Sequence, residues 1–398
     1  MIRFGCLKDL DKGGIQELSE YKEYITKITS DLVKINSENP PGREKEAAEY
    51  VVERLKELGV HAWIDEFAEK RANAMGVIER GEGAGLLFVS HLDTVPAGNK
   101  ELWSVPPFSG LIKDGKIFGR GAADDKGCVA AMLGALKMLA DEDWPIRGRL
   151  IFAAVGDEEV GSGGIKRLIS QGVRADYAVV GEPTKLNIYS AHNGGINFSV
   201  KFLGKSAHAS QPFQGINAIY AASDFALKIE KLAIRLRKKR TFTGSPSISL
   251  TIIKGGVKSN IIPDSCESIL DRRITPEEDP DKVIETVRKI AEKVAKTRRV
   301  KIEFKVMRVI PPAETDRKSE IVQAALKAAS KVLGKKIRLK GLRATCDMTF
   351  LVNEAHIPTI IFGPGDLKQC HAVDEWVSIE ELRKGAEIYK EIAVEILK

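Results

Sequence analysis

The sequence predicts an α/β fold in which a mostly parallel sheet between helix layers carries a second, smaller inserted domain. Apolar strand-like runs alternate with helical patterns before about residue 188 and again after about residue 307. Between these parts the order becomes strand-helix-strand-strand-helix-strand, that of a ferredoxin-like (βαββαβ) module. A chain of 398 residues, 43% of them hydrophobic, can form both cores. We therefore predict one discontinuous domain, residues 1–188 and 307–398, with residues 189–306 inserted into it.

The first part of the chain opens with two amphipathic helices. Apolar residues recur at helical spacing from Tyr21 to Ile35 and from Ala48 to Leu58, and "NSENPPG" (36–42) ends the first helix. Strand-like runs follow in "HAWIDEFA", "NAMGVIE" and "GLLFVSHLD", and "KGCVAAMLGALKMLA" (126–140) is a buried helix. Two more strands, "RLIFAAVGDEE" and "YAVVGEPT", end in acidic residues and enclose the helix "GGIKRLISQG". This alternation favours parallel strands.

The inserted part begins with the alternating strand "INFSVKFLGK" and a long helix over 217–236. Two strands, "SISLTIIKGG" and "ESILDRRI", lead to a helix with Pro280 near its start and to a last strand, "KIEFKVMRV". The α/β pattern then resumes with a helix near 318–333, the strand "IPTIIFG" (357–363) and a closing helix from about residue 379.

Composition narrows the class of protein. We find no apolar run long enough for a membrane span and no signal-peptide core, so we expect a cytoplasmic protein without a membrane partner. Five scattered cysteines without a CxxC pair indicate neither a disulfide framework nor a thiolate zinc site. The net charge of +7 includes runs such as "RLRKKR" (235–240). Solvated helix ends explain these better than a nucleic-acid surface, because no aromatic residues are interleaved.

Histidine and acidic residues gather where the predicted strands end. His91 and Asp93, two apart on a strand, face the same side. Since the carboxyl ends of parallel strands share one edge, we expect a cluster there. Its further members are Asp124, Asp125, Glu158, Glu159, Glu182 and His371. Any one acid could instead cap a helix, and "GSGG" could form a phosphate-binding turn. Together they fit two divalent metal ions: zinc first, with cobalt or manganese as alternatives.

Such a site also needs protein groups that do not bind metal. A pair of metal ions polarises a carbonyl and lowers the pKa of a water, whose proton a nearby carboxylate must accept. Of the adjacent Glu158 and Glu159, one can bind metal while the other faces the water. Asp93 is placed to accept the second N–H of His91 and fix the orientation of its ring.

The motifs of the chain resemble those of one family over essentially its whole length. They are "SHLDTVP", "WSVPPFSG", "GRGAADDKG", "GDEEVGS", "GEPT", "GKSAHAS", "SNIIP", "FGPGD" and the late histidine. The chain resembles the dinuclear-zinc hydrolases that include acetylornithine deacetylase, succinyl-diaminopimelate desuccinylase, aminoacylase and glutamate-type carboxypeptidase. The resemblance implies a catalytic zinc-hydrolase domain and, in the insertion, a lid and dimerisation domain.

The resemblance also implies roles for individual residues. His91 and Glu182 would bind one metal ion, Glu159 and His371 the other, and Asp124 would bridge both. Glu158 would be the general base and Asp93 would orient His91. The peptide bond between Asp124 and Asp125 would be cis.

Further roles implied by the resemblance concern the substrate. His208, in "AHAS", would polarise the scissile carbonyl in the active site of the partner within a homodimer, although a plain surface histidine is the alternative. Asn260 and Arg273 would hold a substrate carboxylate, with Arg272 as an alternative to Arg273. Gly365 would lie in a turn that contacts substrate or in an ordinary turn.

The expected activity is hydrolysis of the amide bond of a small N-acyl amino acid next to a free carboxylate. The alternatives are a carboxypeptidase or aminopeptidase for short peptides and, in another class, a metal-binding protein without activity. The segment "GLRATCDMTF" (341–350) matches neither the desuccinylase nor the deacetylase version, so it leaves the substrate open. Its Cys346 and Asp347 could contact substrate or only pack.

Overall fold

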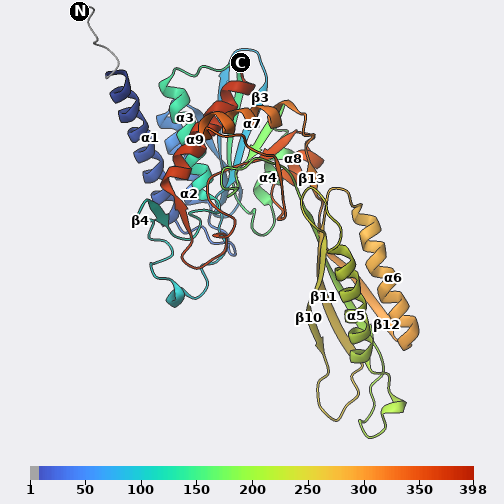
Figure 1. Cartoon of the computed structure of the whole chain (residues 1–398). Helices are drawn as coiled ribbons and strands as arrows, with labels where there is room; N and C mark the ends of the chain where they lie inside the picture. The colour runs from blue at the N-terminus through green and yellow to red at the C-terminus, as the bar shows by residue number, and fades with distance from the viewer. Residues whose placement is uncertain (1–8) are drawn as a thin grey trace, which may run out of the picture. The chain divides into compact units, whose positions relative to one another are not determined.

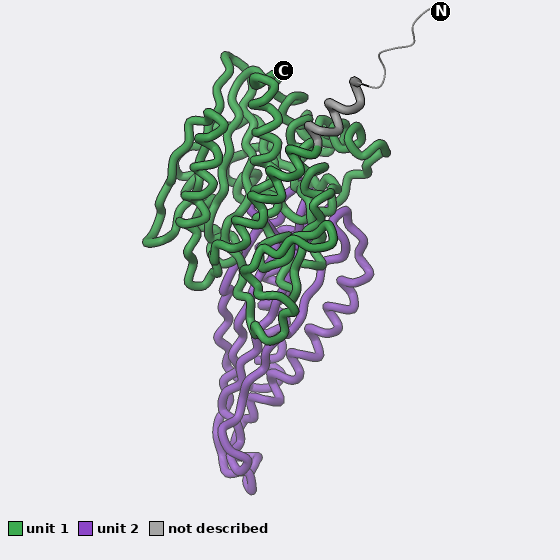
Figure 2. Tube along the Cα trace, turned by 90° about the vertical axis from the view of Figure 1, so that its left-hand side faces the viewer, with its two compact units in different colours: residues 1–190, 315–340, 350–398 green, residues 191–314, 341–349 purple. Residues whose placement is uncertain are grey.

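The computed structural model describes residues 9–398 (Figure 1). The chain forms two compact units (Figure 2). Unit 1 contains the described residues up to Ser190 together with Thr315–Lys340 and Phe350–Lys398. Unit 2 contains Ala191–Glu314 and Gly341–Thr349. Unit 2 therefore extends beyond the predicted insertion of residues 189–306 at its carboxyl end and includes a later segment.

The large sheet is mixed, with parallel strands at its centre. It runs in the order β1-β2-β6-β3-β7-β15-β8-β13, and β14 also pairs with β8. Pairing is parallel from β6 through β3 and β7 to β15, and antiparallel in the other pairs of this path. The strands are β1 (His61–Ala68), β2 (Arg71–Arg80), β3 (Gly85–His91), β6 (Gly148–Val155), β7 (Tyr177–Val180), β8 (Tyr189–His192), β13 (Ala313–Glu314), β14 (Lys340–Leu342) and β15 (Thr359–Ile361).

The predicted α/β class is confirmed, but the parallel arrangement is restricted to the centre of the sheet. Only Glu69 and Lys70 separate β1 from β2, and so short a connection permits antiparallel pairing alone. Every residue of β3 is buried, as expected for a central parallel strand covered on both faces.

Helices pack on this sheet and on one another. α3 contacts both α1 and α9, and a Cβ atom on Gly134 of α3 would lie 2.5 Å from Cγ1 of Ile25. Only glycine permits that close approach. The helices are α1 (Asp9–Lys34), α2 (Lys45–Glu57), α3 (Lys126–Asp141), α4 (Gly163–Ser170), α7 (Glu320–Leu333), α8 (Met348–Asn353) and α9 (Ile379–Ile396), with the short 3-10 helix η1 (Lys100–Leu102). A small sheet contains β4 (Leu111–Lys113), β5 (Lys116–Phe118) and β16 (Trp376–Ser378).

Unit 2 contains an antiparallel sheet with the order β10-β11-β9-β12 and two helices. Along the chain its elements are β9 (Gly194–Leu203), η2 (Pro212–Gln214), α5 (Ala218–Leu236), β10 (Ser247–Gly255), β11 (Ser265–Ile274), α6 (Pro280–Arg298) and β12 (Lys301–Ile310). Asn217 and Asp279 cap α5 and α6 by accepting hydrogen bonds from backbone N–H groups of the first turn. Phe198, Phe202 and Phe225 are fully buried in the core of this unit.

The strand order places three acidic or histidine segments side by side. β6, β3 and β7 are neighbours and run parallel, so the residues after their carboxyl ends meet at one edge. His91 ends β3, Glu158 and Glu159 follow β6, and Glu182 follows β7. Among the residues described, no helix is both long and apolar enough to cross a membrane.

Candidate metal centre

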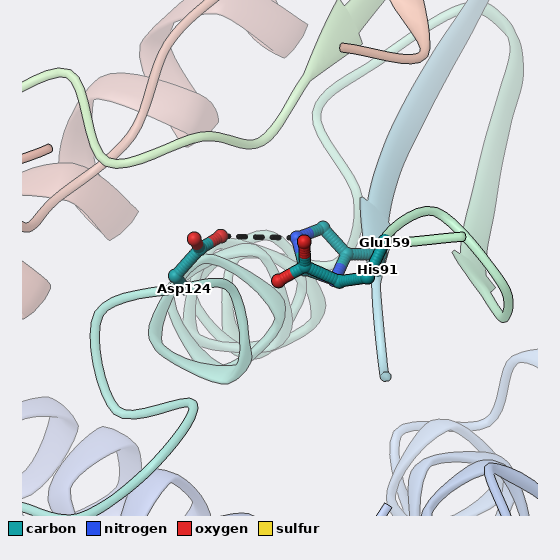
Figure 3. A group of neighbouring side chains, drawn as sticks. All are labelled: His91, Asp124 and Glu159. Atoms are coloured by element: carbon teal, nitrogen blue, oxygen red, sulfur yellow. Dashed lines mark hydrogen bonds and ion pairs between the residues drawn. The ribbon is translucent and has the colours of Figure 1, made fainter. Parts of the chain in front are cut away.

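Three side chains from separate segments converge at this edge (Figure 3). His91, Asp124 and Glu159 each offer one ligand atom, and these atoms all lie within 4.8 Å of one another. Nε2 of His91 is 3.1 Å from Oδ1 of Asp124. Asp124 stands just before α3, and Glu159 lies in the turn after β6.

His371 joins this cluster from a segment near the carboxyl end of the chain. Its Nε2 lies 3.1 Å from Oε1 of Glu159 and 3.4 Å from Oδ2 of Asp124. The two oxygens of Asp124 thus face two different histidines, which is the placement that a carboxylate bridging two metal ions needs. The side chain of His371 is 54% exposed, so this side of the cluster is open to solvent. The carboxylates of Asp124 and then Glu159 raise the pKa of His371 to about 10.

Glu182 and Glu158 add negative charge to the cluster. Glu182 is buried, and it is not one of the three residues whose ligand atoms all lie within 4.8 Å of one another. Burial, followed by the charges of Asp124, Asp125 and Glu158, raises the pKa of Glu182 well above its ordinary value of 4.5. Several carboxylates held together in a buried site therefore repel one another, and a divalent cation would offset that repulsion.

The donor chemistry fits such a cation. The clustered ligand atoms are imidazole nitrogens and carboxylate oxygens, the set that suits zinc, cobalt and manganese. The residues present therefore fit divalent metal ions at this edge of the sheet.

Asp93 contacts Nδ1 of His91 through both its backbone and its side chain. Nδ1 lies 2.9 Å from the carbonyl oxygen of Asp93 and 3.6 Å from its carboxylate Oδ1, with which it forms an ion pair when His91 is protonated. The expected pairing of Asp93 with His91 is therefore present, with the carbonyl oxygen as the nearer atom. When Nδ1 donates to the carbonyl, the lone pair of Nε2 faces Asp124.

The carboxylate of Asp93 also holds the turn after β6. It accepts the backbone N–H of Glu158 at 3.0 Å and that of Glu159 at 3.1 Å. Asn39 donates a third hydrogen bond to it, at 2.9 Å. Burial alone raises the pKa of Asp93, but His91, Asn39 and the Glu159 amide more than offset it, so its pKa lies below the ordinary value.

A second buried carboxylate holds the segment that carries Asp124. Oε1 of Glu375 accepts the N–H groups of Ala123 and Asp124 at 2.9 and 3.0 Å, and Oε2 accepts from Arg120 at 2.6 Å. Glu375 stands four residues after His371, so one side chain ties the segments of both metal-ligand candidates together. Sequence reasoning missed Glu375, Arg120 and Asn39, because a single polar residue in a loop carries no periodic signal.

The peptide bond between Asp124 and Asp125 is cis, as the resemblance implies. Asp125 then lies at the start of α3, where its carboxylate accepts a hydrogen bond from the Ser90 hydroxyl. Burial raises the pKa of Asp125 to about 7.

Three residues predicted to contact substrate, His208, Asn260 and Arg273, lie in unit 2. In unit 2, His208 and Asn260 are neighbours: the N–H of Ala209 donates to the Asn260 carbonyl at 3.0 Å, and Nδ1 of His208 lies 2.7 Å from the Ser210 hydroxyl. Arg273 pairs with Asp271 at 2.9 Å.

The contacts of Arg272 and Gly365 bear on the roles that the sequence left open for these two residues. Arg272 is buried and pairs with Glu278 at 2.7 Å, which is a structural role. In unit 1, Gly365 (φ +90°) donates its N–H to Glu381 and accepts from the Lys185 N–H, so both of its backbone polar groups are engaged.

The chain is similar to known metallohydrolases over most of its length. The model of peptidase family M20/M25/M40 matches residues 87–395. An uncharacterised metallohydrolase of Methanocaldococcus jannaschii is 32% identical, covering 93% of this chain and 98% of that protein. A probable succinyl-diaminopimelate desuccinylase of Staphylococcus aureus is 28% identical over 95% of this chain and 98% of its own. An acetylornithine deacetylase of Myxococcus xanthus is 30% identical over 85% of this chain and 86% of that protein.

Solved structures share the fold. An aminopeptidase from Bacillus cereus superposes with a TM-score of 0.78 at 24% identity, covering 95% of this chain and 99% of that one. A dinuclear metal-binding M20 peptidase from Bacillus subtilis superposes with a TM-score of 0.74 at 18% identity, covering 95% and 99%.

Removing the Glu375 carboxylate should destabilise the protein and weaken its metal binding. Glu375→Leu leaves the buried Arg120 without its partner, and we expect a loss of about 3–5 kcal/mol in the free energy of unfolding. Urea unfolding of metal-free protein measures this loss. Titration calorimetry should show weaker metal binding, because the backbone of Asp124 is released.

The matched control is Glu79→Leu, which breaks the exposed pair with Arg149. That change should lower the free energy of unfolding by less than about 1 kcal/mol. Equal losses in the two variants would contradict the positioning role of Glu375.

Proposed function

The chain belongs to peptidase family M20/M25/M40 and is a metallohydrolase, and we propose that it hydrolyses the amide bond of small N-acyl amino acids. The observation that carries this proposal is the position of Asp124 between His91 and His371, beside the turn of Glu158 and Glu159. Relatives named as a desuccinylase and a deacetylase support the choice of an N-acyl amino acid.

In this proposal, the clustered residues hold two divalent metal ions, with zinc the first choice and cobalt or manganese the alternatives. His91 and Glu182 would hold one ion, Glu159 and His371 would hold the other, and Asp124 would be shared between them. When bound, the ions polarise the scissile carbonyl and lower the pKa of a water.

Glu158 is the proposed general base. Its backbone N–H is held by Asp93, and the neighbouring Glu159 is directed at the cluster, so the two glutamates divide the tasks of proton transfer and metal binding. Glu158 takes the proton of the attacking water and later gives it to the leaving nitrogen. The half-buried position of Glu158 limits the water around that proton.

The geometry of unit 2 supports a homodimer. Asn260, with its neighbour His208, precedes the start of β11 at Ser265. Arg273 lies near the other end of that strand. Ser265 and Arg273 are separated by roughly 27 Å at about 3.4 Å per residue. A dipeptide-sized substrate extends only about 7 Å. One copy of unit 2 therefore cannot place all three side chains on one substrate, and we propose that His208 instead acts on a substrate bound by a second copy of the chain.

Exposed apolar side chains mark the surface for this partner. Tyr220, Leu227 and Ile234 recur every seven residues on α5 and are 63%, 59% and 56% exposed. β10 is an edge strand of the sheet, and its Ile252 and Ile253 are also exposed. A second copy of the chain would cover these apolar side chains and pair the open strand edge.

A substrate panel tests the proposed activity. Purified protein is assayed on N-acetyl amino acids, N-succinyl-diaminopimelate and dipeptides, each with zinc, cobalt or manganese and with a chelator. We expect hydrolysis of an N-acyl amino acid that the chelator abolishes. Preference for dipeptides would favour the peptidase alternative, and no hydrolysis by metal-loaded protein would contradict the proposal.

Glu158→Ala should separate catalysis from metal binding. We expect both metal ions to be retained, because Glu158 is not among the proposed ligands, while the rate falls about 100- to 10,000-fold through loss of the base. Metal analysis and steady-state kinetics measure the two effects. Glu101→Ala, at an exposed glutamate, is the control. Near-normal activity of Glu158→Ala would exclude Glu158 as the base.

Charge placed on the apolar face of α5 should break the dimer. Leu227→Glu with Ile234→Glu should give a monomer by light scattering and a loss of activity, since His208 is then not supplied by a partner. Lys293→Glu, at an exposed position of α6 and therefore off the apolar face of α5, is the control. Mixed His208→Ala and Glu158→Ala subunits should regain partial activity, and a fully active monomer would disprove the role of His208 in the partner subunit.

A further inference from the structure

The loop "NSENPPG" (36–42) between α1 and α2 has no part in the function described so far. Its Asn39 is only 3% exposed, although asparagine is a polar residue that is usually exposed in loops. A buried amide group must find hydrogen-bond partners, and those partners indicate its role.

Asn39 donates to two buried carboxylates that flank the turn of Glu158. Its Nδ2 lies 2.9 Å from Oδ2 of Asp93 and 2.9 Å from Oδ1 of Asp157. An amide nitrogen carries two N–H groups, so one serves each carboxylate. Asp93 holds the backbone N–H groups of Glu158 and Glu159, and Asp157 directly precedes Glu158. The amide therefore joins the two supports of that turn.

The backbone of the loop is itself fixed beside the end of β3. The N–H of Asn39 donates to the Thr94 carbonyl at 2.8 Å, and the N–H of Thr94 donates to Ser37 at 3.1 Å. The hydroxyl of Ser37 donates to the Leu92 carbonyl at 2.6 Å. The loop thus pairs with the residues that follow His91, and this pairing fixes the position of the Asn39 side chain.

The opposite side of Asp157 is also held. Arg71 donates to its Oδ1 at 2.8 Å and pairs with the fully buried Glu44 at 2.6 Å. The N–H of Gly163 donates to Oδ2 at 3.0 Å. Asp157 has a positive φ of 71°, so the chain turns sharply immediately before Glu158. Arg71 neutralises Asp157 from one side, and the Asn39 amide separates Asp157 from Asp93 on the other.

We propose that Asn39 is a positioning residue for Glu158, acting through the carboxylates of Asp93 and Asp157. The inference rests on the proposed role of Glu158 as general base. Loss of the two donors leaves two buried carboxylates close together without the group between them, so the turn shifts. A small displacement of a catalytic group reduces the rate without changing how the rest of the site binds substrate.

The test compares Asn39→Ala, Asn39→Asp and the control Asn36→Ala. Asn36 lies in the same loop, but it is exposed and its amide donates to Glu38. We expect Asn39→Ala to lower kcat by about 10- to 100-fold with KM nearly unchanged. Asn39→Asp should lower kcat further than Asn39→Ala does, because it adds a third carboxylate beside Asp93 and Asp157. This is expected although aspartate is closer in shape to asparagine than alanine is. Asn36→Ala should behave as the unchanged protein.

Two further measurements separate positioning from a general loss of stability. In metal-free protein, amide hydrogen exchange of residues 157–160 should be about fivefold faster in Asn39→Ala, with α3 unchanged. In the Glu158→Ala background, Asn39→Ala should cause no further loss of rate, because the group that it positions is already absent.

The outcomes also distinguish the two proposals. Activity of Glu158→Ala equal to that of the unchanged protein would overturn the proposed base and this inference with it. An inactive Glu158→Ala together with a fully active Asn39→Ala would overturn this inference alone. A loss of rate that is additive with Glu158→Ala, or exchange that is faster throughout the chain, would show that Asn39 acts elsewhere.

Discussion

The structure of the site depends on one constraint: several carboxylates must be held close together at a buried sheet edge. Asp124 is at the centre of this arrangement, since its two oxygens face His91 and His371. Bringing like charges together in a buried place is costly unless hydrogen-bond donors or cations surround them. The fold meets this requirement with two imidazoles, with backbone N–H groups and, in our proposal, with two metal ions.

Two buried polar networks hold the cluster from different sides. Glu375 accepts hydrogen bonds from the backbone N–H groups of Ala123 and Asp124 and from the side chain of Arg120. On the other side, Asp93 and Asn39 hold the turn of Glu158. Each carboxylate accepts more than one hydrogen bond, which fixes its position through the backbone. The backbone of Asp124 and that of Glu159 are therefore held by protein contacts alone, and such preorganisation reduces the cost of binding and of reaching the transition state.

Unit 2 contains the features that bear on substrate and assembly. His208 and Asn260 lie together at one end of its sheet, and the exposed apolar residues of α5 and β10 lie on its surface. Residues 341–349 also belong to this unit, although the chain returns to unit 1 on either side of them. Cys346 and Asp347, in this segment, are both buried.

The amino-acid sequence by itself determined the α/β class, the order of the longer helices and strands, and the candidate residues at the strand ends. These follow from local periodicity and from the rule that parallel strands share a carboxyl edge. Only the tertiary structure decided that the carbonyl oxygen of Asp93 lies nearer to Nδ1 of His91 than its carboxylate does, and that Asn39 and Glu375 support the site. The contacts of Asn39 and Glu375 join segments far apart in the chain, and hydrogen bonds between them depend on how the helices and strands pack, which no local pattern records.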